Sequence, residues 1–269
     1  MVVSLSLMFE AGAQPTRNPY APFGSLGDPD SPYPSVDTWF DYGVHEGIPR
    51  LLDLFDRHKV RVSSFMVGKA VERNPSLARE IVERGHEAAA HGYEWKPHWR
   101  MTPAEETASY EANIAAIERA TGIRPVGFNA FALRNGPNTL GILQSLGFEY
   151  YIDELARDEP YLITVAGKPF GVVPYTRRNN DIERFHPARS SAVDYLSDLR
   201  DEFDVLYAES EYRRRMMVVS THDRIAGQPA IAKAHDAFIA YALKHPGVVF
   251  MRKDEISRWA MAQPDTPRA

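Results

Sequence analysis

Three side chains suited to acid/base chemistry each follow a short run of apolar or small residues. Glu10 comes directly after Val2–Phe9, His91 follows three alanines, and His222 follows the apolar segment 216–221. Such runs are typical of buried strands, so each polar residue is expected at a strand end. A carboxylate and two imidazoles at one edge of a sheet could act as general base and general acid. Each residue alone is compatible with a structural role, but together they form a candidate acid/base site.

A fourth candidate, Arg134, precedes the sequence Asn135-Gly136-Pro137, which is typical of a turn that leads into a helix. An arginine in this place could clamp a substrate carbonyl or carboxylate, or hold Glu10 in its ionised form. The alternative is a surface arginine that only caps the turn.

The composition limits the chemistry that these residues can carry. The 269 residues include 31 Lys+Arg, 36 Asp+Glu, nine histidines and no cysteine. Thiolate zinc sites, iron–sulfur clusters, disulfides and cysteine nucleophiles are therefore excluded, and a metal would need histidine and carboxylate ligands. The net charge of −5 gives no basic surplus, so we expect neither nucleic acid nor a membrane surface as a partner.

The sequence shows no membrane span and no secretory signal. No segment approaches the roughly 18 consecutive apolar residues of a spanning helix. Residues 1–9 are apolar but short, and they run directly into Glu10 without a preceding basic region. We therefore expect a cytoplasmic protein that begins with a buried strand.

Residues 13–42 form a long segment that we expect to be irregular. It contains six prolines together with several aromatic residues, whereas a flexible linker would be poor in aromatics. Irregular segments of this length are usually functional or are linkers. A loop that covers a pocket is one interpretation, and a packed surface excursion or subunit contact is the other.

Beyond this segment, strand-like and helix-like patterns alternate. Residues 102–121 give the clearest helix signal, with Thr102 as N-cap, Pro103 in the first turn and Glu105 at the capping-box position. Alternation predicts parallel strands joined by crossover helices. We predict an α/β fold, a distorted (β/α) barrel of about seven parallel strands in a single domain covering 1–269. An open doubly wound sheet is the alternative, but no G-x-G-x-x-G follows the first strand. The expected strands are 1–9, 60–67, 87–90, 124–129, 148–152, 170–174, 216–221 and 248–251.

Several segments of the sequence resemble a known family. Residues 62–91 (VSSFMVGKAVERNPSLAREIVERGHEAAAH) closely resemble the polysaccharide deacetylase domain, or carbohydrate esterase family 4. Residues 136–150 and 218–222 match its later helix and strands. The resemblance implies a distorted (β/α) barrel and covers nearly the whole chain except 13–42.

The departures from the family pattern concern its metal site. Members of the family typically end the first strand in T-F-D-D-G, in which one aspartate is the base and the next binds a divalent metal. Here Glu10 and Ala11 take these places, and Trp95 replaces the second histidine of H-S/T-x-x-H. The arginine of the R-P-P-Y motif is also absent, near Asn129. The resemblance therefore predicts no metal or other cofactor, with zinc at a site rebuilt around His91 as the alternative.

The remaining motifs are similar to a metal-independent branch of the superfamily that includes a deacetylase-like allantoinase. That branch has Glu at the base position, H-G-x-x-W, R-x-G-P-N-T and V-I-P-Y-T-x-x-x-N-D, matched here at Glu10, 91–95, 134–139 and 172–181. It implies hydrolysis of a non-peptide C–N bond in a small, cyclic amide, imide or ureide. It also suggests a homo-oligomer with a small-molecule substrate.

Specific roles follow from this resemblance. We expect Glu10 to deprotonate the attacking water, His222 to protonate the departing nitrogen, and His91 to orient the water or stabilise the oxyanion. Five further residues are expected to contact substrate: Trp95, Arg134, Tyr175, Asn180 and Asp181. The alternatives are a metal-dependent N-deacetylase of an acetylated sugar and a non-catalytic protein that kept a ligand pocket.

Overall fold

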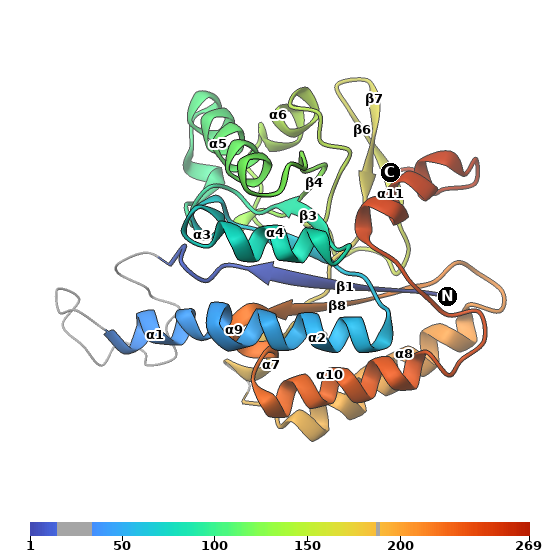
Figure 1. The fold of residues 1–269 in the computed structure, drawn as a ribbon. Coiled ribbons are helices and arrows are strands. Elements are labelled where there is room, and N and C mark those ends of the chain that lie inside the picture. Colours follow the sequence, from blue (N-terminus) through green and yellow to red (C-terminus); the bar gives the residue numbers. More distant parts are fainter. Residues whose placement is uncertain (15–33, 187–188) are drawn as a thin grey trace.

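A computed structural model describes residues 1–14, 34–186 and 189–269 of the chain, and its strands form one curled sheet surrounded by helices (Figure 1). The order of the main strands is β6-β7-β5-β4-β3-β2-β1-β8, and β9 pairs with the start of β1. The strands are β1 (Val2–Phe9), β2 (Ser63–Met66), β3 (Glu87–Ala90), β4 (Gly127–Phe128), β5 (Tyr150–Tyr151), β6 (Tyr161–Val165), β7 (Lys168–Val172), β8 (Met216–His222) and β9 (Val249–Phe250).

The pairings confirm the predicted α/β fold and its parallel sheet. Every pairing is parallel except that of β6 with β7. A bridge between Asn180 and Ser220 also brings the chain beyond β7 alongside β8. The segment that follows β7, near one edge of the curled sheet, therefore lies against β8 at the other edge, as in an open barrel.

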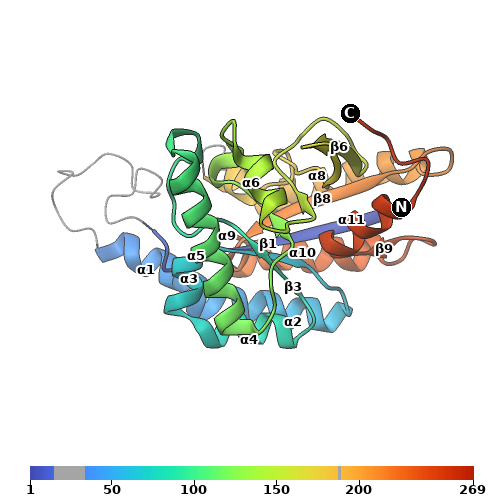
Figure 2. The same ribbon diagram turned by 90° about the horizontal axis from the view of Figure 1, so that it is seen from above.

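Helices cover the outside of the sheet. In Figure 1, α2, α8 and α10 lie together on one side and α3, α4, α5 and α6 on the other, and Figure 2 shows the same wrapping from above. The helices are α1 (Pro34–Tyr42), α2 (Ile48–His58), α3 (Gly68–Arg73), α4 (Pro75–Glu83), α5 (Pro103–Thr121), α6 (Thr139–Ser145), α7 (Asp181–Phe185), α8 (Ala192–Glu209), α9 (Asp223–Ala226), α10 (Pro229–Ala242) and α11 (Lys253–Ala262).

Two expectations about local structure need correction. Residues 34–42 were expected to be irregular, but they form helix α1, which continues through a π-helical turn into α2. The rest of the predicted loop that lies in 15–33 is outside the described residues. Strand β6 was not expected. It forms a hairpin with β7 through Ala166 and Gly167, so the strictly parallel pattern ends at that edge.

The alternation of β1 decides which of its side chains face the helices. Its odd-numbered apolar residues, Val3 to Phe9, join the large core beneath the helices. Its even-numbered residues, Ser4, Ser6 and Met8, face the inside of the curl, since side chains alternate along a strand. Met8 packs there in a separate, smaller apolar cluster. Glu10 continues this inward-facing series at the carboxyl end of the strand.

Candidate active site

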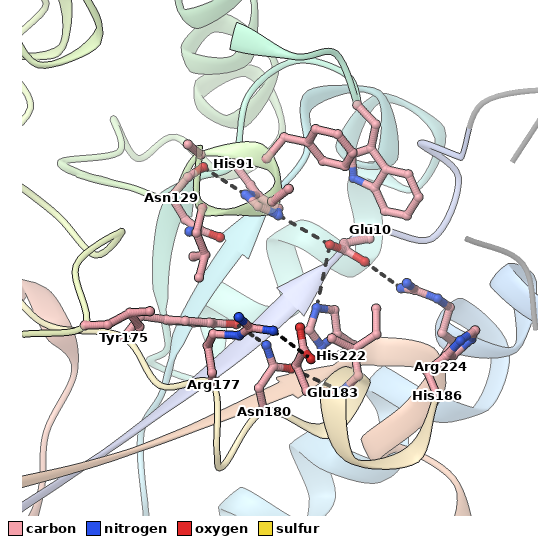
Figure 3. Close-up of a pocket in the computed structure, with 17 residues that line it drawn as sticks. Glu10, His91, Asn129, Tyr175, Arg177, Asn180, Glu183, His186, His222 and Arg224 are labelled. Carbon is pink, nitrogen blue, oxygen red and sulfur yellow. Dashed lines mark hydrogen bonds and ion pairs between the residues drawn. The ribbon is translucent and has the colours of Figure 1, made fainter. Parts of the chain in front are cut away.

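The three predicted acid/base residues meet at the carboxyl ends of neighbouring strands. Along the sheet the order of the strands is β3, β2, β1 and β8. His91 directly follows β3, Glu10 directly follows β1, and His222 is the last residue of β8. Each side chain continues the inward-facing series of its strand, after Met8, Ala89 and Ser220. Figure 3 shows the three side chains pointing toward one another.

Glu10 lies at the centre of the group and its two carboxylate oxygens have different partners. Its Oε1 is 3.3 Å from Nε2 of His91 and 3.9 Å from Nε2 of His222. Its Oε2 accepts a hydrogen bond of 2.6 Å from Nη1 of Arg224. Burial alone would raise the pKa of Glu10, but the charges of Arg224 and His222 and the contact with His91 lower it below its ordinary value. The geometry therefore keeps this carboxylate ionised.

A hydrogen bond to the backbone orients His91. Its Nδ1 lies 2.9 Å from the carbonyl oxygen of Asn129. A carbonyl can only accept, so Nδ1 carries a hydrogen, while Nε2 lies toward Oε1 of Glu10. The side chain of Asn129 in turn contacts the half-buried Asp153, whose pKa is raised to about 7 by desolvation, against the effect of its hydrogen bonds to Ala130 and Asn129.

His222 is held by a buried carboxylate. Its Nδ1 is 2.5 Å from Oδ1 of Asp181, and Oδ2 of Asp181 accepts from the backbone N–H of His222. Burial lowers the pKa of His222, but the charges of Asp181 and Glu10 outweigh it and raise the pKa. With Nδ1 engaged by Asp181, Nε2 is the atom that can carry a mobile proton toward Glu10.

A cavity of about 660 Å³ opens above this group. Trp95 and Phe131 form part of its wall, with ring centroids 5.9 Å apart and planes inclined by 25°. Tyr175 and Asn180 line another part, and the Nδ2 of Asn180 lies 3.5 Å from the Tyr175 hydroxyl. Three of the expected substrate-contacting residues are thus brought to the cavity.

The other two expected contacts lie elsewhere. Arg134 is exposed, and its guanidinium stacks 4.3 Å from the centre of the Trp99 ring rather than lining the cavity. The turn that precedes it includes Ala132 and Leu133 with positive φ angles, and Leu133 lines the cavity in its place. Asp181 is fully buried beneath His222, so it positions that histidine and does not reach the cavity.

Comparison with known proteins agrees with this arrangement. Residues 29–151 match the family model described as polysaccharide deacetylase. A crystal structure of a probable polysaccharide deacetylase from Pseudomonas aeruginosa PAO1 is 32% identical, covers 98% of this chain and 92% of its own, and superposes with a TM-score of 0.88. The chain belongs to the polysaccharide deacetylase family.

Two further relatives of this hydrolase family have different names. The crystal structure named PuuE allantoinase is also 32% identical, with the same coverage of both chains and a TM-score of 0.90. A peptidoglycan deacetylase of Helicobacter pylori is 27% identical over 267 residues, which is 87% of this chain and 89% of that protein. The family therefore includes relatives named for more than one kind of substrate.

The residues present do not fit the divalent metal that polysaccharide deacetylases use. At the two positions where the family pattern places further ligands, this chain has the methyl group of Ala11 and the indole of Trp95, and neither can coordinate a metal. The backbone N–H of Ala11 donates instead to Oδ2 of Asp223 at 2.7 Å. Within the described ranges, no group of three or more His, Asp or Glu residues is arranged to hold a metal ion.

Sequence reasoning missed Arg224 and Asp223. Asp223 accepts the backbone N–H groups of both Glu10 and Ala11, which fixes the chain where β1 ends. Both residues directly follow His222, so the signal was present in the sequence. Their roles depend on how the chain turns into α9, which strand alternation does not predict.

None of the described helices is long and apolar enough to cross a membrane.

Proposed function

We propose that this protein hydrolyses a C–N bond of a small, cyclic amide, imide or ureide by general acid/base catalysis without a metal. One observation carries the proposal. The carboxylate at the base position is paired with a buried arginine and faces two histidines, while Ala11 and Trp95 replace metal-binding side chains. The protein's own residues therefore have to activate the water and stabilise the charge.

We place the attacking water in the cavity, beside the contact between Glu10 and His91. The Oε1 of Glu10 and the Nε2 of His91 lie 3.3 Å apart, and both residues line the cavity. A water molecule that donates a hydrogen to Oε1 would have a lone pair free to attack a substrate carbonyl, with the His91 ring beside it. As the C–O bond forms, one water proton passes to Oε1 of Glu10 and the carbonyl oxygen becomes an oxyanion.

His222 is the proton donor for the departing nitrogen. Asp181 holds the ring by Nδ1, and the raised pKa of His222 favours the form with a second proton on Nε2. When the tetrahedral intermediate collapses, the C–N bond breaks and this proton passes to nitrogen. The carbonyl carbon becomes a carboxylic acid, Glu10 returns its proton to solvent and His222 takes one up, so that both groups are restored. Each proton transfer of this kind contributes about 10²–10⁴ in rate.

The cavity favours a small substrate with a flat face. Its volume of about 660 Å³ suits a small molecule. The rings of Trp95 and Phe131 give it a planar apolar wall, while Tyr175 and Asn180 supply hydrogen-bonding groups. Arg224 also lines the cavity, where its guanidinium is paired with Glu10.

A substrate panel tests the proposal. Purified protein would be dialysed against a strong chelator and assayed with allantoin, hydantoin, dihydrouracil, succinimide and N-acetylated sugar oligomers. Turnover of a cyclic compound at an unchanged rate after metal removal is the expected result. Acetate release from sugars that depends on added zinc would overturn it in favour of a deacetylase, the activity for which the Helicobacter relative is named. No turnover with any compound would favour the non-catalytic alternative.

A further inference from the structure

Arg224 is a buried cation inside the candidate site. Its side chain is 1% exposed, and Nη1 contacts Oε2 of Glu10 at 2.6 Å and Oδ1 of Asp223 at 3.2 Å. A guanidinium loses much hydration free energy when it is buried, and ion pairs with good geometry are needed to offset that loss. The carboxylate of Glu10 supplies one such pair at the point where the chemistry is expected, and Figure 3 shows the contact from the cavity side.

Three aromatic rings surround the same guanidinium. Its central carbon lies 4.3 Å from the ring centre of Phe40, 4.8 Å from that of Trp39 and 5.6 Å from that of Trp95. The rings also pack on one another, with centroids 5.0 Å apart for Trp39–Phe40 and 5.4 Å for Phe40–Trp95. A cation over aromatic faces is attracted by their electron-rich surfaces, most strongly when water is excluded.

Two of the three rings come from α1. Trp39 and Phe40 lie near the end of this helix, and Phe40 is fully buried. Helix α1 also contacts α9, the short helix that begins with Asp223 and carries Arg224. The cage of Trp39, Phe40 and Trp95 therefore joins α1 to the end of β8 through the arginine.

The contact also makes the two oxygens of Glu10 different. Since Oε2 is engaged by Arg224, Oε1 is the oxygen left between the two histidine rings, at 3.3 and 3.9 Å from their Nε2 atoms. A carboxylate free to rotate would present either oxygen to the water. The arginine thereby orients the base and balances its charge.

We propose that Arg224, held by the aromatic cage, is the positioning residue that fixes Glu10 with Oε1 toward the water, and that α1 is part of the active site. Its positive charge beside Glu10 also opposes the entry of a divalent cation. The inference rests on the proposed function for its kinetic test, but not for its metal-binding test.

The kinetic test uses Arg224→Ala and Arg224→Lys. We expect kcat of Arg224→Ala to fall about 10²-fold, because a misplaced base loses alignment with the water, while KM changes little. Adding free guanidinium should raise kcat of Arg224→Ala about tenfold, whereas urea, a neutral molecule of similar shape, should not raise it. A lysine keeps the charge but not the planar contacts, so Arg224→Lys should fall between the two.

The matched control is Arg214→Ala. Arg214 also combines an aromatic face with a carboxylate, since it lies 4.6 Å from the Trp259 ring centre and pairs with Asp265 at 2.9 Å. It is remote from the cavity lining, so its loss should leave kcat unchanged. Equal losses in both variants, or a loss in Arg224→Ala that guanidinium does not reverse, would overturn the positioning role.

The second test does not use activity. Zinc binding would be measured by calorimetry for Ala11→Asp/Trp95→His and for the same protein with Arg224→Ala added, after circular dichroism confirms that each is folded. We expect tight zinc binding only when Arg224 is removed. Equal zinc affinity with and without Arg224 would contradict the inference, even if the wild-type protein turned over no compound in the panel. If either multiple variant is unfolded, the guanidinium rescue of Arg224→Ala, compared with Arg214→Ala, decides the positioning role.

Discussion

The Oδ1 of Asp181 lies 2.5 Å from Nδ1 of His222, and Oδ2 of the same carboxylate accepts hydrogen bonds from the backbone N–H groups of His222 and Ala226. One fully buried side chain thus fixes the position, the rotation and the tautomer of the histidine. The negative charge beneath the ring also raises its pKa. This aspartate, first expected to bind substrate, lies outside the cavity lining, and in the proposed function it holds the acid.

The first prediction concerns Asp181→Asn. An amide can donate to Nδ1, which favours the wrong tautomer of His222, so we expect kcat to fall about 10²–10⁴-fold. The pKa of His222 should also fall without the buried charge. Since the proposed acid is the protonated ring, the alkaline limb of the pH–rate profile should move to lower pH. The control is Asp194→Asn, an exposed residue near the start of α8.

Asp181→Asn should also change how the free energy of unfolding depends on pH. His222 has a folded-state pKa above its ordinary value, so its contribution to the free energy of unfolding is complete below about pH 6.5 and is lost as pH rises through the folded pKa. The difference in unfolding free energy between wild type and Asp181→Asn should therefore shrink with rising pH. A pH-independent difference, measured by urea titration, would mean that Asp181 does not raise the pKa of His222.

The second prediction is that Glu10→Gln loses the base but keeps the fold. The glutamine oxygen can still accept from Arg224, whereas the amide nitrogen cannot take a proton from water. We expect kcat to fall about 10²–10⁴-fold with an unchanged circular dichroism spectrum. Glu149→Gln is the control, because Glu149 pairs with Arg258 on the surface. Wild-type turnover by Glu10→Gln would falsify the assignment of the base.

The acid/base residues at the strand ends were predictable from the sequence, because their positions depend on the residues that precede them directly in the chain. The residues Glu10, His91 and His222 follow runs that are typical of buried strands, and parallel strands bring their carboxyl ends to one edge. The two-residue periodicity of those strands then turns all three side chains inward. Short strands such as β4 and β5 were also expected, although each is only two residues long.

The contacts that complete the site were not predictable in the same way. Arg134 and Arg224 both follow strands, and nothing local distinguishes the arginine that stacks on a surface ring from the one that reaches Glu10. Arg224 is inward because α9 turns directly after β8 and because Trp39 and Phe40 close over it. Those rings lie in a proline-rich segment whose last part folds as a helix against the barrel, and this is a long-range event.

The third prediction concerns Lys253, which is buried at the far end of the barrel interior. Its Nζ donates to Oγ of Ser4 at 3.0 Å, and burial lowers its pKa to about 7, against the smaller effect of Glu87. Below pH 7 the folded protein must hold a buried charge, so Lys253→Met should raise the free energy of unfolding there by a few kcal/mol, since each unit by which the pKa is lowered corresponds to about 1.4 kcal/mol. Ser4 keeps a partner, since its hydroxyl donates to the carbonyl of Met251.

The sign of this effect depends on pH. The lysine is protonated in the unfolded chain up to about pH 10.5 but loses its proton near pH 7 when folded, so the stability of the wild type recovers as pH rises between these values. The gain from Lys253→Met should therefore shrink from pH 6 to pH 10 in thermal or urea unfolding. Lys244→Met, at an exposed position, should show no such trend.

The fourth prediction tests the capping box at the start of α5, the clearest helix signal in the sequence. The hydroxyl of Thr102 accepts from the backbone N–H of Glu105 at 3.3 Å, and the Glu105 carboxylate accepts from the backbone N–H of Thr102 at 2.8 Å, which completes the capping box of α5. Thr102→Ala removes one of these contacts and should lower the free energy of unfolding by about 0.5–2 kcal/mol. Thr102→Ser keeps the hydroxyl and should stay near wild type. Because the cap is exposed and α5 lies outside the barrel, kcat on any confirmed substrate should be unchanged in both variants. A loss of activity without a loss of stability would contradict this prediction. It would show that α5 supports the His91 side of the site more directly than its contacts indicate.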